Sequence, residues 1–169
     1  MRKIAGGVLV CLAFVGCSAY AETLVGRVVS VADGDTLTLL DAGRRQHKIR
    51  LAQIDAPEKN QAFGQRSRES LAALCAGRAA EVLNEGKDRY GRVVGRVLCA
   101  RVDANSEQVR RGMAWVFDRY APASSPLYRL QAEARVARQG LWYDAQPTAP
   151  WTWRAARSSR AKTTPPRSG

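Results

Sequence analysis

The sequence predicts an α+β fold, a five-stranded OB-type β-barrel with three α-helices. Three observations lead to this prediction. Strand-like segments come as a group of three and then a group of two, one helical segment separates the groups, and two helical segments follow. A five-stranded barrel with a helix between its third and fourth strands accommodates that order. At 169 residues the chain is long enough for one domain with a hydrophobic core.

The first three strands are expected between residues 23 and 54. "TLVGRVVSV" is rich in β-branched residues, and "DTLTLL" follows a tight turn at Gly34. Hydrophobic and basic residues alternate in "RRQHKIRLAQI", which places Ile49 and Lys48 on opposite faces of a strand. "DAPEKNQ" is typical of a turn, because the residue before a proline avoids the helical conformation.

A helix is expected over residues 61–76, with Gly77 as its end signal. Six of its residues share one face: Phe63, Ser67, Ser70, Leu71, Leu74 and Cys75. "AAEVLNE" and "RVVGRVLCARV" predict strands four and five, joined by a turn at "KDRYG".

Two further helices complete the predicted domain. Asn105 is expected to cap the first, with Gln108 as its capping-box partner, and that helix ends at Gly112. The second spans residues 126–139, with Ser125 as its cap and Pro126 at its first position.

The two ends of the chain differ in composition from this domain. Residues 1–21 combine basic residues, a short apolar run and "AYA", which predicts a signal peptide cleaved before Glu22. "FVGC" leaves open a lipoprotein signal, with a lipid anchor at Cys17. The predicted domain covers residues 22–144. Residues 145–169 hold four prolines, five basic residues and no acids, and are expected to form a disordered basic tail, with Trp151 and Trp153 packing onto the body where the tail begins.

Export has consequences for charge and for cysteine pairing. Without residues 1–21 the chain has 25 basic and 15 acidic residues, a net charge of +10, which favours a polyanionic partner such as nucleic acid. Anionic lipid or polysaccharide fits the charge equally well.

Cys75 and Cys99 remain after removal of residues 1–21, and in an exported protein they are expected to form a disulfide rather than two buried thiols. No segment after residue 21 is apolar enough to span a membrane, so the protein is expected in the periplasm or outside the cell.

A few charged residues at strand ends and turns could carry chemistry. Asp35, Asp55 and Glu58 are acids in a basic protein, and a hard cation such as Ca²⁺ prefers their oxygen ligands. The chain has no Cys/His cluster for zinc, and His47 is expected at the surface. Taken alone, "DGDT" and "IDAPE" are ordinary turns. Their combination with Arg50 and Arg92 favours a site.

The ordered set of these pieces resembles the staphylococcal nuclease (thermonuclease) family. The matching segments span about residues 23 to 143: "VADGDTLTL", "IRLAQIDAPE", "DRYGRVVGRV", "VRRGMAWVF" and "RQGLW". Each segment alone is a weak motif, but the set in this order is specific.

The resemblance implies roles for individual residues. Asp35 and Asp55 match the family's metal-binding aspartates, and Ala56 falls where the family's third metal contact is a main-chain carbonyl. Arg50 and Arg92 match the arginines that hold the scissile phosphate. Glu58 matches the carboxylate proposed to activate water.

Substrate-binding positions follow from the same resemblance. Arg89 and Tyr90 match positions near a terminal phosphate, and Tyr120 matches a residue that lines the base pocket. A second aromatic of that pocket is replaced by Asp118, which leaves base preference open.

These roles agree with the chemistry of the residues and predict a metal-dependent hydrolase. Arginine donates paired hydrogen bonds to phosphate, a bound cation neutralises phosphoryl oxygen, and a carboxylate can accept a proton from water. We expect an exported, monomeric Ca²⁺-dependent endonuclease that cleaves DNA and RNA, leaves 3′-phosphate ends and needs no protein partner. Two alternatives remain: an OB-fold module that binds nucleic acid without cleaving it, and a surface protein that adheres to anionic polymers through its tail.

Overall fold

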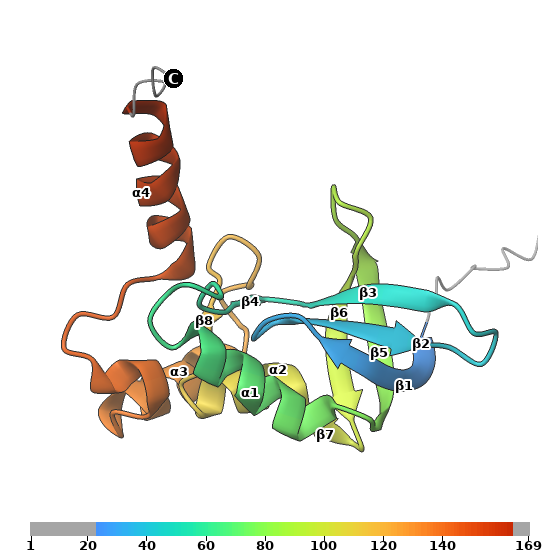
Figure 1. Cartoon of the computed structure of the whole chain (residues 1–169). Helices are drawn as coiled ribbons and strands as arrows, with labels where there is room; N and C mark the ends of the chain where they lie inside the picture. The colour runs from blue at the N-terminus through green and yellow to red at the C-terminus, as the bar shows by residue number, and fades with distance from the viewer. Residues whose placement is uncertain (1–22, 164–169) are drawn as a thin grey trace, which may run out of the picture.

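The computed structural model describes residues 23–163 and contains a closed β-barrel, a group of helices on one side of it, and a projecting C-terminal helix (Figure 1). The expected signal peptide and the alternative lipid anchor at Cys17 lie outside the described residues. Among residues 23–163, no helix combines the length and apolar character that crossing a membrane requires.

Five strands form the barrel: β1 (Thr23–Val31), β2 (Thr36–Leu40), β3 (Gln46–Leu51), β5 (Ala79–Lys87) and β6 (Val93–Cys99). Neighbours pair antiparallel in the order β3-β2-β1-β5-β6, and a parallel pairing of β3 with β6 closes the ring. Alternating side chains fill the interior, including Leu37, Leu39, Ile49, Val82 and Val97, each fully buried. The predicted α+β fold with a five-stranded OB-type barrel is therefore confirmed.

Two predicted strands are interrupted. After β3 the chain turns at Gln53, where φ is 63°, before the short strand β4 (Ile54–Asp55), which pairs with β8 (Trp115–Val116). After β6 it turns at Ala100 and Arg101, both with positive φ, before β7 (Val102–Asp103). The first turn places Asp55 in a short strand outside the barrel sheet, where it pairs with Trp115.

The helices α1 (Gly64–Cys75), α2 (Ala104–Arg110) and α3 (Leu127–Val136) pack beside the barrel, and the 3₁₀ helix η1 (Gly140–Tyr143) follows α3. Leu71 and Cys75 of α1 face the core, and Cys75 forms a disulfide with Cys99 of β6. The disulfide, with an S–S distance of 2.06 Å, joins helix α1 to the barrel wall.

The expected cap of α2 is wrong. Asp103, not Asn105, accepts a hydrogen bond at the helix start, from the Ser106 amide at 3.1 Å. Asn105 is buried, accepts from the Val97 amide (3.0 Å) and donates to the Ala52 carbonyl (2.9 Å). Gln108 is also buried, and its amide donates to the Gly34 carbonyl at 2.7 Å. Both side chains satisfy buried main-chain groups that sequence spacing does not reveal.

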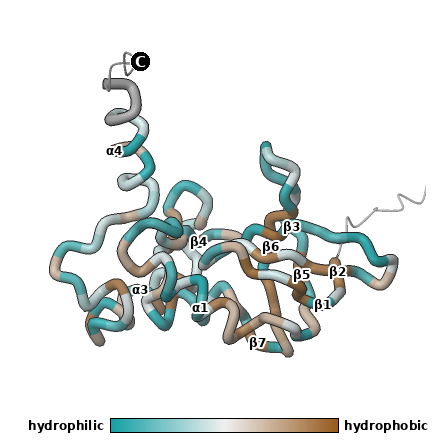
Figure 2. The backbone as a smooth tube through the Cα atoms, viewed as in Figure 1, coloured by the Kyte–Doolittle hydropathy of each residue, from teal (hydrophilic) through white to brown (hydrophobic). Residues whose placement is uncertain are grey.

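The C-terminal segment departs most from expectation. Residues 145–169 were expected to be disordered, but Pro150–Thr163 form helix α4. The helix begins at a proline, which suits a first helical position, and continues with alanine and arginine, which favour helix. Figure 2 shows intermediate and hydrophilic residues along the coloured part of α4, whereas several barrel strands contain hydrophobic stretches.

Candidate active site

Three strands bring the central residues of the predicted site together. Asp35 directly precedes β2, Arg50 lies in β3, and Asp55 ends β4. The β2–β3 pairing places Thr36 opposite Arg50, and the Leu51 amide donates to the Asp35 carbonyl at 2.8 Å. As a result, Nη2 of Arg50 lies 3.1 Å from Oδ2 of Asp35 and 3.0 Å from Oδ1 of Asp55. One guanidinium nitrogen therefore joins carboxylates that are 20 positions apart in the chain.

The "DGDT" segment is a turn that also holds Asp35 rigidly. The Asp33 carboxylate accepts from the Asp35 amide at 3.1 Å, which orders the turn. Oδ1 of Asp35 accepts from the Thr36 hydroxyl (3.0 Å), and Oδ2 accepts from the Ala56 amide (2.6 Å). Gly34 is required here because an added Cβ would collide with the Ser67 side chain of α1. The turn of the "DGDT" segment is thus also what positions Asp35 in the candidate site.

The Asp35–Asp55 pair is almost inaccessible to solvent. Asp35 is 5% exposed and Asp55 is 2% exposed. Burial raises the pKa of Asp55, with a smaller contribution from the charge of Asp35, and this outweighs the hydrogen bonds from Arg154 and the nearby charge of Arg50. Burial also raises the pKa of Asp33 to about 7, assisted by the charge of Asp35. Crowded, buried carboxylates of this kind need a compensating cation to stay ionised.

These oxygens suit a hard divalent cation. Two buried carboxylates converge on one nitrogen of Arg50, and carboxylate and carbonyl oxygens are the ligands that Ca²⁺ prefers. Within residues 23–163, however, no three His, Cys, Asp or Glu side chains converge at metal-binding distance. A bound ion would therefore need main-chain or water oxygens besides Asp35 and Asp55. Ala56, the residue after Asp55, is buried, and its amide donates to Asp35.

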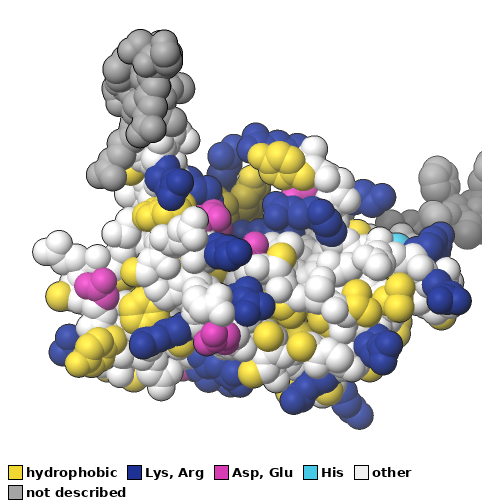
Figure 3. Space-filling model, viewed as in Figure 1, with side chains coloured by type: hydrophobic (Ala, Val, Ile, Leu, Met, Phe, Trp, Pro, Cys, Tyr) yellow, Lys and Arg dark blue, Asp and Glu magenta, His cyan; other side chains and the backbone are white. Residues whose placement is uncertain are grey.

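Glu58 is connected to this pair through a residue of α4. Nη1 of Arg154 lies 2.7 Å from Oε1 of Glu58, and Nη2 lies 2.6 Å from Oδ2 of Asp55. Burial works against the charge of Arg154, but its hydrogen bonds to Asp55 and Glu58 outweigh burial and raise its pKa. Figure 3 shows acidic side chains bordered by Lys and Arg in the hollow between α4 and the projecting β5–β6 hairpin.

Arg92 directly precedes β6, the strand that pairs with β3, and makes different contacts. The β3–β6 pairing matches Ile49 with Val93, so Arg92 lies just before the point where β6 joins β3. Its Nε donates to Oδ2 of Asp88 at 2.7 Å, and no ion pair among the described residues joins it to Asp35, Asp55 or Glu58. Burial opposes ionisation of Asp88, but the hydrogen bonds from Arg92 outweigh it and lower the pKa of Asp88.

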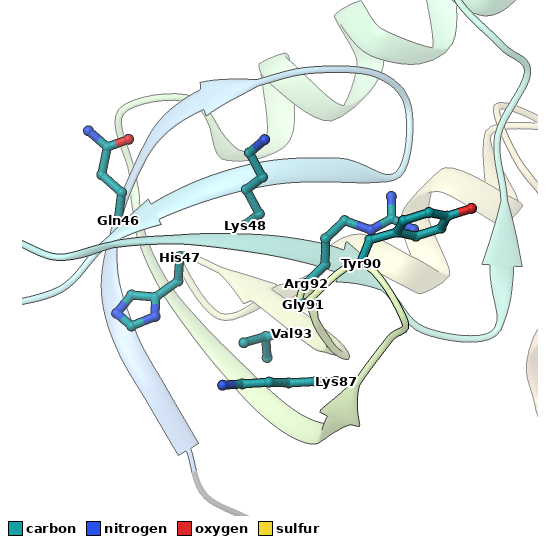
Figure 4. Close-up of a pocket in the computed structure, with 8 residues that line it drawn as sticks. All are labelled: Gln46, His47, Lys48, Lys87, Tyr90, Gly91, Arg92 and Val93. Atoms are coloured by element: carbon teal, nitrogen blue, oxygen red, sulfur yellow. The ribbon is translucent and has the colours of Figure 1, made fainter.

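The predicted terminal-phosphate residues surround Arg92 at the tip of the β5–β6 hairpin. Nη2 of Arg89 donates to the Tyr90 hydroxyl at 2.6 Å, and the Tyr90 ring lies 5.6 Å from the Arg92 guanidinium carbon. A cavity of about 260 Å³ opens beside them, lined also by Lys48 and Lys87. Figure 4 shows the Arg92 and Tyr90 side chains lying together on one side of β3. The cavity is basic and polar, which suits an anionic group.

Tyr120 belongs to the segment that follows β8. It is 64% exposed and packs edge-on against Phe117, with ring centroids 5.1 Å apart. Phe117 in turn stacks flat on Trp151 of α4, also at 5.1 Å. Phe117, Tyr120 and Trp151 therefore form one aromatic cluster between the segment after β8 and the start of α4. The sequence did not indicate this combination.

His47 takes no part in the central cluster. Its Nε2 lies 2.8 Å from Oδ2 of Asp41 in the β2–β3 hairpin. This hydrogen bond, with those from Arg45, lowers the pKa of Asp41 to about 2. His47 is partly buried rather than fully on the surface, and it supports the hairpin.

Comparison with known proteins assigns the chain to a family. Residues 48–144 match the model of the family described as "Staphylococcal nuclease homologue". The chain belongs to the staphylococcal nuclease family. Over 166 residues, 92% of each chain, it is 37% identical to a Shigella flexneri protein named micrococcal nuclease. Over 139 residues it is 42% identical to a Haemophilus influenzae protein named uncharacterized endonuclease, covering 82% of this chain and 76% of the relative.

A third relative gives the same result. An Escherichia coli protein, also named uncharacterized endonuclease, is 45% identical over 130 residues, which are 76% of this chain and 84% of the relative. The staphylococcal nuclease resemblance expected from the sequence is thereby confirmed, and the chain is a nuclease of this type, a hydrolase that acts on nucleic acid.

Arg154 is the residue of this nuclease's site that sequence reasoning missed. It lies 99 positions after Asp55, in a segment whose composition predicted disorder. The available signal was local: "PWTWRAAR" places tryptophan and arginine three residues apart, on one face of any helix that begins at Pro150. Which carboxylates that face meets is decided by the tertiary structure alone.

Proposed function

We propose that this nuclease is an exported, Ca²⁺-dependent enzyme that hydrolyses phosphodiester bonds of DNA and RNA and leaves 3′-phosphate ends. The observation that carries the proposal is the joint contact of Arg50 with Asp35 and Asp55 in one buried cluster. A strong phosphate ligand and a pair of hard oxygen donors lie within hydrogen-bond distance of each other. We propose further that it acts as a monomer without a protein partner.

The proposed metal ligands are the carboxylates of Asp35 and Asp55 and the carbonyl of Ala56. When bound, the ion supplies positive charge against a phosphoryl oxygen. Asp35 is held for this role by its hydrogen bonds to Thr36 and the Ala56 amide. Because these hydrogen bonds fix the Asp35 carboxylate before the ion arrives, that ligand needs little reorganisation on binding.

The proposed catalytic residues are Arg50, Glu58 and Arg92. Arg50 and Arg92 donate paired hydrogen bonds to phosphate oxygens and stabilise the charge that builds up in the transition state. Arg50 is held at its place by its own hydrogen bond to the Leu51 carbonyl at 2.8 Å. Glu58, 38% exposed at its side chain, has access to water and accepts the proton from the attacking molecule.

The proposed substrate contacts are Arg89 and Tyr90 at the hairpin and Tyr120 beside Phe117. Tyr90 and Arg92 line the basic cavity, where a terminal phosphate fits by charge, and Arg89 donates to the Tyr90 hydroxyl. Tyr120 is exposed and already in contact with another ring, so a base can stack on it.

Export is supported by the leader-like composition of residues 1–21 and by the Cys75–Cys99 disulfide. Disulfides persist in oxidising compartments such as the periplasm. Mass spectrometry of the protein from its native host distinguishes a mature N-terminus at Glu22 from a lipidated Cys17.

The test is digestion of supercoiled plasmid DNA and single-stranded RNA with Ca²⁺, with Mg²⁺, and with chelator. We expect cleavage of both substrates in Ca²⁺, loss of cleavage in chelator, and product ends that phosphatase treatment converts to 3′-hydroxyl. Retarded but intact nucleic acid, indifferent to calcium, would instead identify a binding module. Deleting residues 145–169 separates the adhesive alternative, because an adhesive protein would lose all binding to DNA.

A further inference from the structure

Helix α4 places a positive charge on the carboxylates that the proposed reaction needs free. Both oxygens of Asp55 accept hydrogen bonds from arginine: Oδ1 from Arg50 (3.0 Å) and Arg154 (3.3 Å), and Oδ2 from Arg154 (2.6 Å). The same Arg154 guanidinium binds Glu58. A divalent ion coordinated by Asp55 needs lone pairs of these same oxygens, and Arg154 donates hydrogen bonds to both of them.

The start of α4 is seated by packing as well as by charge. Trp151 stacks on Phe117 with an angle of 5° between the rings, and it meets Trp115 edge-on at 5.7 Å. The segment before the helix is held by the Gln61 side-chain amide, which donates to the Thr148 carbonyl at 2.7 Å. Trp151 and Arg154 are three residues apart, so one face of the first helical turns makes both contacts.

The described residues that follow Arg154 in α4, Ala155 to Ser159, are exposed. In Figure 1 the helix projects from the body and only its first turns lie near the barrel and the other helices. The Arg154 side chain itself is 42% exposed, in contrast to 3% for Asp55. A partly exposed arginine on a helix anchored at one end can leave its carboxylates without unfolding the domain.

We propose that α4 is an autoinhibitory latch, in which Arg154 competes with the divalent ion for Asp55 and withdraws Glu58 from reaction until ion and substrate displace it. This inference rests on the proposed function of the same site. The Asp55 oxygens cannot bind the divalent ion and the Arg154 guanidinium fully at the same time. Ion binding and the latched position of Arg154 therefore exclude each other. The phosphates of a nucleic acid also attract Arg154, and substrate binding therefore favours the released helix.

The first measurement is Ca²⁺ affinity by calorimetry, without nucleic acid, for the full chain and its variants. Removing the competing charge in Arg154→Ala should tighten Ca²⁺ binding by about tenfold, given the strength of hydrogen bonds between charged groups. Arg157→Ala is the matched control, because it removes a charge from the same helix. Among the described residues, the Arg157 guanidinium lies over the Trp153 ring, 4.7 Å from its centroid, and forms no ion pair with Asp55 or Glu58. The Ca²⁺ affinity of this variant should stay within twofold of the parent.

The second measurement follows the helix itself. Limited trypsin digestion with mass spectrometry reports the rate of cleavage after Arg157, and saturating Ca²⁺ should increase this rate in the parent protein. Trp151→Ala unseats the helix without touching a carboxylate, and should raise both the cleavage rate and the Ca²⁺ affinity. Circular dichroism melts verify that each variant is folded.

Three outcomes would overturn the latch. One is Ca²⁺ binding in Arg154→Ala that is equal to or weaker than in the parent, and the second is protection of α4 that Ca²⁺ does not change. The third is the absence of Ca²⁺ binding in every variant, because the ion then does not compete with Arg154 for Asp55. Failure of the proposed function looks different: Ca²⁺ binds, the helix is released, and nucleic acid is still not cleaved.

Discussion

The contact of Arg50 with two buried aspartates makes a quantitative prediction about stability. Arg50→Met keeps an unbranched side chain similar to the aliphatic part of arginine and removes the charged guanidinium group. Asp35 and Asp55, with side chains 8% and 3% exposed, would lose the guanidinium nitrogen that lies 3.1 Å and 3.0 Å from them. Removing one partner of a buried ion pair costs about 3–5 kcal/mol, because the remaining charge is left uncompensated.

Two features place the expected loss near the lower end of that range. Arg154 still pairs with Asp55, and Asp55, whose pKa burial has raised, can take up a proton instead of remaining charged. We therefore expect Arg50→Met to lower the free energy of unfolding by about 3 kcal/mol in chelator at neutral pH. Urea denaturation followed by circular dichroism measures this, with the slope of the transition unchanged.

Arg45→Met is the matched control. Arg45 also pairs with an aspartate, Asp41, but its side chain is 79% exposed, so we expect a loss below about 0.5 kcal/mol. Adding Ca²⁺ should reduce the difference in free energy of unfolding between Arg50→Met and the parent, because an ion held by Asp35 and Asp55 replaces the missing charge. An ion at 100 times its Kd stabilises the protein that binds it by about 2.7 kcal/mol. Equal losses in the two variants, in chelator, would refute the reasoning.

Three further predictions concern catalysis, the disulfide and pH. Glu58→Gln should lower turnover on plasmid DNA by about 10²-fold or more without changing the melting temperature; an unchanged rate would remove Glu58 from the proposed role. Reducing Cys75–Cys99 should lower stability by about 3 kcal/mol in urea titrations with and without dithiothreitol, and coincident curves would contradict this. Because the His47 hydrogen bond and those from Arg45 lower the pKa of Asp41 from 3.8 to about 2, its contribution to stability is complete above about pH 4 and is lost as pH falls toward 2. In acid titrations the Asp41→Asn variant should therefore lack that part of the decline, and a decline equal to the parent's would count against it.

The barrel could be predicted because its signals are local. Alternation around Ile49 and the β-branched residues of β1 and β2 specify which side chains enter the core, whatever the rest of the chain does. The cap of α2 could not be predicted in the same way. Asp103 and Asn105 are both suitable cap residues by type, and the choice depended on whether the barrel needed Asn105 for the Val97 amide and the Ala52 carbonyl.

The site was predicted in part for the same reason. Asp35, Arg50, Asp55 and Glu58 lie in two short segments whose motifs identify them, and the structure brings Asp35, Arg50 and Asp55 into direct contact. Arg92 was expected in the same pocket, but its side chain pairs with Asp88 in the hairpin. The side-chain position of an arginine depends on which carboxylate is nearest, and spacing along the chain does not contain that information.

The amino-acid sequence by itself determined the α+β barrel, the family and the residue types of the site, because each follows from short-range pattern and ordered motifs. Only the tertiary structure decided that the C-terminal segment forms a helix seated on Phe117, and that Arg154 reaches Asp55 and Glu58. The physical reason is that a tail without acids and with many basic residues repels itself when alone. Its helix becomes favourable where buried carboxylates and an aromatic surface offset that cost, and their position is a property of the folded domain.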